Sequence, residues 1–235
     1  MDQRFEKWER WLEAIREEVM DLVRSKHIFW KLGDIVKNNP KIQKPNSFYK
    51  FAGETYFAYA VMGIRRQIRP HKDSILFVGL LKEIIKTPSV LSRERFVALY
   101  EKDAQYEKDA QFEANHDFAQ FAREGTDYID PNLVHQDLSK LKELGNKVEE
   151  FADRQIAHYD KRPAKKVPSF GELDACIDFL AELTEKYWLL FKSVDIRDDW
   201  VPTPVEDHWD EIFRQPWIPP DTPDESIDPD PLGMY

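Results

Sequence analysis

The chain has 235 residues and a formal net charge of −10, with 34 Lys and Arg against 44 Asp and Glu. Its 15 Phe and 7 Trp can fill a sizeable core, whereas the single cysteine excludes an internal disulfide and a cysteine-based metal site. The longest apolar stretch, 56–64, is shorter than the about 20 residues of a membrane helix. The charged N-terminal segment also lacks the apolar run of a secretory signal. We therefore expect a cytoplasmic protein that contacts no membrane.

The negative charge is concentrated at the C-terminal end of the sequence. Residues 195–235 contain 12 acidic and 2 basic residues, which gives −10. Residues 1–194 contain the remaining 32 acidic and 32 basic residues and are neutral overall. The acidity therefore belongs to a tail, and the rest of the chain is free to carry a basic patch.

Apolar residues recur at intervals of three and four over 3–37, which predicts a long first helix that ends before Asn38. A second helix is expected over 47–68. One face of this second helix carries Phe51, Thr55, Tyr59 and Met62. Its basic C-terminal end carries Arg65, Arg66 and Arg69.

A shorter helix is expected to follow, capped by Asp73 or Ser74 and running to about Lys86. A short side-chain oxygen at that position can accept the free N–H groups of the first turn. Residues 92–124 predict one helix or two stacked helices. They contain a tandem repeat, EKDAQY and then EKDAQF, which we interpret as a local duplication because two copies do not define a repeat protein.

Two further helices have clear start signals. Asp130 followed by Pro131 predicts a helix that runs to about Asp160, because proline is well placed in a first turn. A basic, proline-containing turn is expected over 161–168. Ser169 and Glu172 then form a capping box that opens a helix to about Lys192.

No segment has the alternating pattern of a β-strand, so we predict an all-α fold, an up-and-down bundle of about five to six helices. The expected domains are the bundle, 1–194, and an acidic, proline- and tryptophan-containing tail, 195–235. The tail either wraps the bundle through Trp200, Trp209 and Trp217 or stays solvated.

The helix that starts at Pro131 has a buried stripe whose rhythm continues to Gln155 and His158, with Arg154 one turn before the histidine. Polar groups at the end of such a stripe are expected to meet another helix, a partner subunit or a ligand. The alternative is a histidine that simply caps the C-terminal end of a helix.

The stretch EFADRQIAHYD, residues 150–160, resembles the signature helix of the HEPN superfamily, and it is most similar to the AbiU-like branch of phage abortive-infection proteins. The resemblance implies a helical bundle that often forms a homodimer, here through the helix over 131–160. It also implies a composite site that cleaves RNA without a metal or other cofactor.

Carried over onto this sequence, the resemblance makes His158 the acid/base and Arg154 the phosphate ligand, since histidine titrates near neutral pH and arginine binds phosphate in a fork. We assign supporting roles to Asp153, Tyr159 and Asp160. Basic residues expected to attract the RNA backbone are Arg65, Arg66, Lys161, Arg162, Lys165 and Lys166.

The spacing departs from the family pattern. The family has four to six residues between arginine and histidine, whereas three residues separate Arg154 from His158. The position with four residues between holds Asp153. Arg154 could reach the same space from the same helix, or Arg65 or Arg66 could substitute from another helix.

Two functional hypotheses follow. The first is an RNase of a phage-defence or toxin–antitoxin system, with RNA or a nucleotide, a second copy and an antitoxin as partners. The second is a non-catalytic HEPN-like module that binds RNA, nucleotide or protein. Glu113 and His116 have the spacing of half a di-iron motif, but no second copy exists, so we expect no metal site.

Overall fold

The computed structural model describes residues 3–71, 73–103, 107–156, 166–197, 200 and 209–216, without the side chains of 101–103, 107–110 and 156. The chain divides into two compact units, 1–201 and 202–235. The described ranges contain seven α-helices and no β-strand, only two isolated bridges. The prediction of an all-α helical bundle is therefore confirmed.

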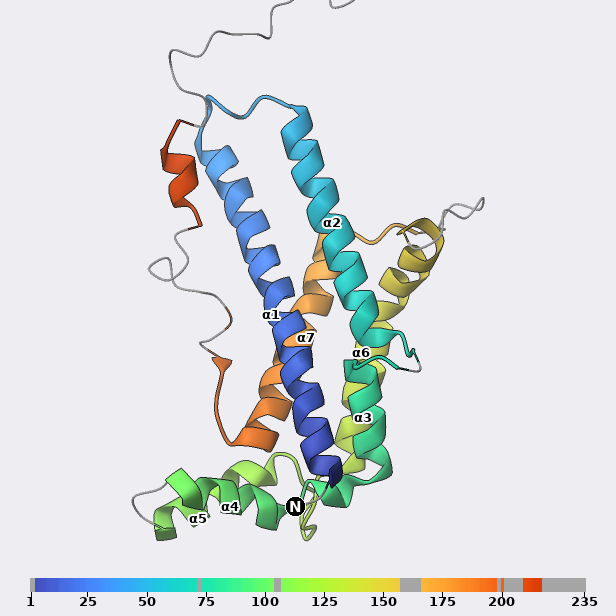
Figure 1. Ribbon diagram of the computed structural model, residues 1–235, viewed down its shortest axis with the longest axis vertical. Coiled ribbons are helices and arrows are strands. Elements are labelled where there is room, and N and C mark those ends of the chain that lie inside the picture. The colour runs from blue at the N-terminus through green and yellow to red at the C-terminus, as the bar shows by residue number, and fades with distance from the viewer. Residues whose placement is uncertain are drawn as a thin grey trace, which may run out of the picture. The chain divides into compact units, whose positions relative to one another are not determined.

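Four long helices lie side by side and form the bundle (Figure 1). They are α1 (Gln3–Asn38), α2 (Ser47–Ile68), α6 (Pro131–Phe151) and α7 (Phe170–Lys192). The short helix α3 (Phe77–Lys86) packs against α6 and α1. The helices α4 (Arg93–Asp103) and α5 (Glu107–Ala119) pair with each other at the end of the bundle where α1 begins.

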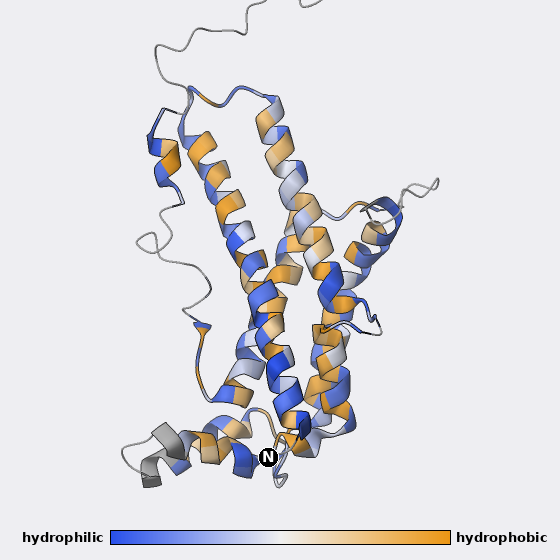
Figure 2. Cartoon of the chain, viewed as in Figure 1, coloured by the Kyte–Doolittle hydropathy of each residue, from blue (hydrophilic) through white to orange (hydrophobic). Residues whose placement is uncertain are grey.

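The stripe predicted for the first helix is the buried face of α1. Its members recur at three- and four-residue intervals, and Figure 2 shows hydrophobic and hydrophilic residues interspersed along α1. All are at most 5% exposed: Phe5, Trp8, Leu12, Ile15, Val19 and Leu22. The expected bounds of this helix, 3–37, agree with Gln3–Asn38 to within one residue.

The second helix has the expected bounds, but the face noted from the sequence is the exposed one. Phe51 is 64% exposed and Tyr59 is 39% exposed. The buried face of α2 carries smaller and aliphatic residues instead, including Ala60, Ile64 and Ile68. The large aromatic side chains of this helix are therefore divided between the core and the surface.

Two glycines let α2 approach its neighbours closely. A Cβ added at Gly63 would lie 2.5 Å from Cδ2 of Leu22 on α1. A Cβ added at Gly145 on α6 would lie 2.6 Å from Cδ1 of Ile68 on α2. Because real Cβ atoms are not found so close to other carbons, side chains larger than hydrogen would push α2 away from both helices.

The expected cap of α3 is wrong. The N-cap position is Leu76, which provides no side-chain hydrogen bond, and the helix begins three residues after Ser74. The first-turn N–H of Phe77 instead donates to Oε1 of the buried Gln67 at 3.2 Å. Since Gln67 lies on α2, a tertiary contact replaces the local cap that the sequence suggested.

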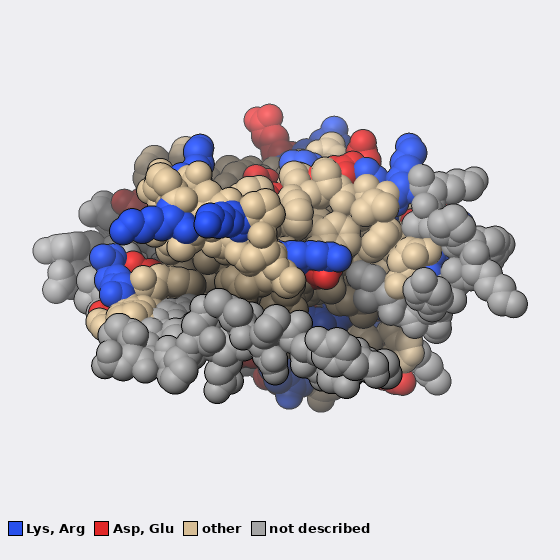
Figure 3. Space-filling view, turned by 90° about the horizontal axis from the view of Figure 1, so that it is seen from above, with Lys and Arg blue, Asp and Glu red and all other residues tan. Residues whose placement is uncertain are grey.

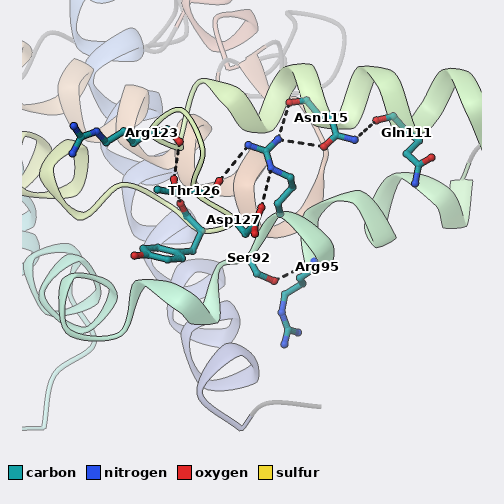
Figure 4. Close-up of polar contacts among 9 residues, drawn as sticks. Ser92, Arg95, Gln111, Asn115, Arg123, Thr126 and Asp127 are labelled. Atoms are coloured by element: carbon teal, nitrogen blue, oxygen red, sulfur yellow. Dashed lines mark hydrogen bonds and ion pairs between the residues drawn. The ribbon is translucent and has the colours of Figure 1, made fainter.

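Residues 92–124 contain two paired helices, α4 and α5, which agrees with the second of the two predicted arrangements. A loop returns from α5 to α6 and is fastened to α4 by Arg93. Figure 4 shows Asn115, Thr126 and Asp127 converging on this arginine. The Arg93 guanidinium also lies 4.8 Å from the centre of the Phe118 ring. These contacts fix the start of α6 relative to the paired helices.

The start signals of α6 and α7 are confirmed. The Asp130 side chain accepts a hydrogen bond from the Asn132 N–H at 2.8 Å, with Pro131 in the first turn. Ser169 and Glu172 form the expected capping box. A hydrogen bond from Lys147 and the two hydrogen bonds with Ser169 lower the pKa of the Glu172 carboxyl to about 2.

The beginning of the acidic region packs as part of the first unit. Ile196 and Trp200 are buried, and the Trp200 Nε1–H donates to the Glu185 carboxylate at 2.5 Å. In the second unit, Trp209 and Phe213 make an edge-to-face contact beside the short 3-10 helix Glu211–Arg214. Trp217 lies outside the described residues, and the division at residue 194 remains a prediction.

In the part of the chain that the structure describes, no helix combines the length and the apolar character needed to cross a membrane.

Replacing Gly63 with alanine is expected to lower the free energy of unfolding, because overpacking against Leu22 costs about 1–3 kcal/mol. The higher helix propensity of alanine offsets up to about 1 kcal/mol of this cost. The matched control is Gly53→Ala on the same helix, where an added Cβ meets nothing within 4 Å. This control should stabilise the protein by up to about 1 kcal/mol. Urea unfolding of both variants measures the difference, and equal effects would show that α2 does not need the glycine at 63.

The Cys176 thiol should be almost unreactive in the folded protein. It is fully buried, its Sγ–H donates to the Leu144 carbonyl at 3.1 Å, and burial raises its pKa to about 12. Near pH 8.5, where about half of an ordinary exposed thiol is thiolate, a disulfide reagent should modify native protein far more slowly than urea-unfolded protein. Equal rates would show that the α6–α7 contact opens readily.

Candidate functional site

The last turns of α2 and α6 meet in a cluster of two arginines around one carboxylate. Arg65 Nε lies 2.8 Å from Oδ1 of Asp153, and Arg69 forms an ion pair with the same oxygen. The Asp153 side chain is 31% exposed, and those of Arg65 and Arg69 are 20% and 42% exposed. Partial burial makes these charge pairs stronger than pairs on an open surface.

The carboxylate sits where α6 leaves α-helical geometry. Residues Ala152–Ile156 form a π-helical turn that follows directly after Phe151. Such turns widen the helix by one residue and are frequent at functional sites. Ala152 is fully buried, while Asp153 and Arg154 are half-buried. The sequence predicts that Arg154 and His158 are neighbours on one α-helix, but the α-helical register ends at Phe151.

Packing holds this turn against α2. The Phe151 ring contacts the Phe57 ring edge-to-face at 5.4 Å between centroids. Nearly two turns of α6 earlier in the chain, Gly145 admits the Ile68 side chain. The Arg65–Asp153 pair therefore forms where packing already holds α2 against α6.

The arginines named from the sequence point in different directions. Nη2 of Arg154 lies 3.3 Å from Oε1 of Glu150 on the preceding turn of α6. Arg66 Nε donates to the Glu18 carboxylate on α1 at 3.3 Å. Of Arg65 and Arg66, the two proposed substitutes for a phosphate ligand, Arg65 is the one that pairs with Asp153 in the π-helical turn after α6, whereas Arg66 pairs with Glu18.

Arg69 was not among the residues selected for the site, yet it contacts Asp153 directly. The available signal was its spacing, since a residue four positions after Arg65 lies on the same face at the end of a helix. The sequence alone did not reveal which acidic residue that face would meet.

A cleft of about 620 Å³ opens beside the cluster, between α1 and the end of α2. Its lining includes three arginines, one histidine and two carboxylates: Glu18, Arg65, Arg66, Arg69, His71 and Asp73. Gln67 forms its floor, with Nε2 donating to Glu18 at 2.8 Å. The excess of guanidinium groups suits an anionic ligand.

Six of the predicted site residues lie outside the described residues: His158, Tyr159, Asp160, Lys161, Arg162 and Lys165. Lys166 is described and is exposed, three residues before the cap of α7. The structure thus brings Arg65 into contact with Asp153. Arg154 follows Asp153 in the chain and pairs with Glu150. The predicted roles of these residues remain predictions.

Within the described ranges, no cluster of three or more His, Cys, Asp or Glu side chains could hold a metal ion. Glu113 and His116 belong to no such cluster among these residues.

Comparison with protein families identifies a match. The family model HEPN_AbiU2, described as AbiU2, matches residues 5–212, which is most of the chain and includes both α2 and the π-helical turn. No curated protein matches the chain. No solved structure matches it either.

Replacing Asp153 with asparagine is expected to lower the free energy of unfolding by about 1 kcal/mol at low salt, because two partly buried guanidiniums lose their counter-charge. Glu150→Gln is the matched control on the same helix face, since it removes only the exposed pair with Arg154 and should cost no more than about 0.5 kcal/mol. Urea unfolding at two salt concentrations measures both. A cost for Asp153→Asn no greater than that of the control would contradict a stabilising cluster.

Proposed function

The chain belongs to the AbiU2 family of HEPN proteins, an abortive-infection type, and on this premise we propose that it is a metal-independent endoribonuclease. The observation that carries the proposal is the convergence of Arg65 and Arg69 on the end of α6, beside Arg154 and at the start of the segment that contains His158. In this proposal, the guanidinium groups of Arg65 and Arg69 bind the phosphate in place of an arginine at the family's usual spacing from the histidine.

Cleavage of RNA by its own 2′-hydroxyl needs a general base, a general acid and a cationic group that binds the phosphate. The 2′-hydroxyl loses its proton to a His158 imidazole as its oxygen attacks the adjacent phosphorus. The bond from phosphorus to the 5′-oxygen breaks, and a protonated imidazole gives its proton to that oxygen. The products are a 2′,3′-cyclic phosphate and a free 5′-hydroxyl, with no water consumed. Arginine stabilises the charge that builds up on the phosphate oxygens during attack.

Two copies of the chain supply the acid and the base in this proposal, with α6 of one copy facing α6 of the other across a two-fold axis. The solvent-facing side of α6 is polar and carries His135, Gln136, Ser139 and Lys142, all exposed. A dimer formed there has a hydrophilic interface, so its stability should depend on salt.

The position of Asp153 supports a second function, a binding module without turnover. A carboxylate stands where family spacing expects arginine, and it pairs with Arg65 and Arg69. In that case RNA or nucleotide phosphates compete with Asp153 for the same guanidiniums, and His158 transfers no proton. An antitoxin or another protein partner would fit either function.

The proposal predicts that purified protein cleaves mixed RNA in excess EDTA and leaves cyclic phosphate ends. His158→Ala should lower the rate by about 10²–10⁴-fold, the usual contribution of a general acid or base. Gel analysis of the fragments, followed by phosphatase treatment of their 3′ ends, measures both features.

His116→Ala is the matched control, because it removes an exposed histidine from α5, away from the proposed dimer face, and should leave the rate unchanged. Cleavage that persists in His158→Ala would remove this residue from the mechanism. RNA binding without cleavage in the wild type would instead support the binding module.

A further inference from the structure

The exposed face of α2 carries a stripe of aromatic side chains. Phe48 is 45% exposed, Phe51 is 64% exposed and Tyr59 is 39% exposed. These residues and Arg66 are separated by 3, 8 and 7 positions, which places all four on one side of an α-helix. At about 1.5 Å per residue the stripe extends for about 27 Å.

The stripe lies within the most basic part of the neutral 1–194 region. Residues 28–69 contain eight Lys and Arg but only Asp34 and Glu54 as acids, so their net charge is +6. One of these acids is neutralised locally, since Glu54 lies 3.8 Å from the Lys50 ammonium. All residues in this segment are described, and its α1–α2 turn exposes Lys37, Lys41 and Lys44.

Figure 3 views the end of the molecule that carries this turn, and Lys and Arg side chains lie there across a mostly uncharged surface. At the other end of the stripe, the half-exposed Arg66 lines the cleft beside the Arg65–Asp153 pair. The stripe thus connects a lysine-bearing turn to the candidate catalytic site. Aromatic rings lie between two cationic regions along a single helix.

We propose that the exposed face of α2 is a binding track for single-stranded RNA, which leads the strand from the α1–α2 turn to the arginine cleft. Bases stack on Phe48, Phe51 and Tyr59 while lysines and arginines hold the phosphates. Aromatic platforms within a basic groove are how proteins bind single strands without reading their sequence. This inference rests on the proposed function, since it concerns delivery of RNA to the same site.

Charge favours this occupant over a second copy of the chain. A two-fold contact through the stripe would bring together two faces that each end in exposed cations, Lys41 and Lys44 at one end and Arg66 at the other, which opposes association. RNA carries the opposite charge along its whole length, and binding it releases counterions. Duplex RNA suits the face poorly, because its bases are stacked inside and cannot meet the rings.

Binding of a fluorescein-labelled oligouridine of about 12 nucleotides, within the usual range for single-strand sites, tests the track by fluorescence anisotropy in EDTA. Full-length Phe51→Ala/Tyr59→Ala is expected to bind about tenfold or more weakly, since each stacked base contributes about 1–3 kcal/mol. Phe112→Ala is the matched control. It removes a 76% exposed phenylalanine from α5 and should leave the affinity unchanged.

The charged turn is tested by Lys41→Gln/Lys44→Gln, which should make the dependence of log affinity on log salt shallower by about 1.4, at about 0.7 per phosphate contact. Lys86→Gln, which replaces an exposed lysine at the end of α3, should not change this slope. Neither pair of substitutions touches the core, so circular dichroism should show the same helix content in all four variants.

The outcomes separate the track from the proposed function. Weaker binding in the aromatic double variant supports the track whether or not the wild type cleaves RNA. Wild-type cleavage with unchanged oligouridine affinity in that variant would overturn the track and leave the proposed function standing. A change of molar mass in solution without loss of RNA affinity would show that the face joins two copies, and would also overturn it.

Discussion

The close approach of α2 to both α1 and α6 is the constraint on which the rest of the structure depends. Gly63 admits Leu22 of α1, and Gly145 admits Ile68 of α2. With hydrogen in place of a side chain at these two points, the Leu22 and Ile68 side chains fill the space that a Cβ would take. Dispersion between such surfaces is short-ranged, so an added methyl group at either glycine would weaken contacts along the whole interface.

The candidate site follows from that approach. Ile68 packs against Gly145 and Phe57 against Phe151, and these contacts hold α2 against α6 where Arg65 and Arg69 reach Asp153. The π-helical turn at Ala152–Ile156 then widens α6 where the carboxylate projects. Packing in the core and the charge cluster at its edge are thus parts of one arrangement.

The same helix presents two chemically different faces. Its buried face carries Ala60, Ile64 and Ile68 and joins the core, whereas Phe51 and Tyr59 stay at the surface beside a segment of net charge +6. Large rings left in water are costly unless something covers them. Within a chain whose overall charge is −10, the exposed rings lie on α2 between the lysines of the preceding turn and the candidate site at its end.

Periodicity and local chemistry in the sequence determined the helices, because the 3.6-residue repeat, the Asp130 cap and the Ser169–Glu172 box act between near neighbours. The resemblance at residues 150–160 indicated the family. Tertiary structure decided that Gln67 caps α3, that Phe51 faces solvent and that Arg65 and Arg69 meet Asp153. Those outcomes depend on contacts between residues far apart in the chain, and an amphipathic pattern does not specify which partner each face will meet.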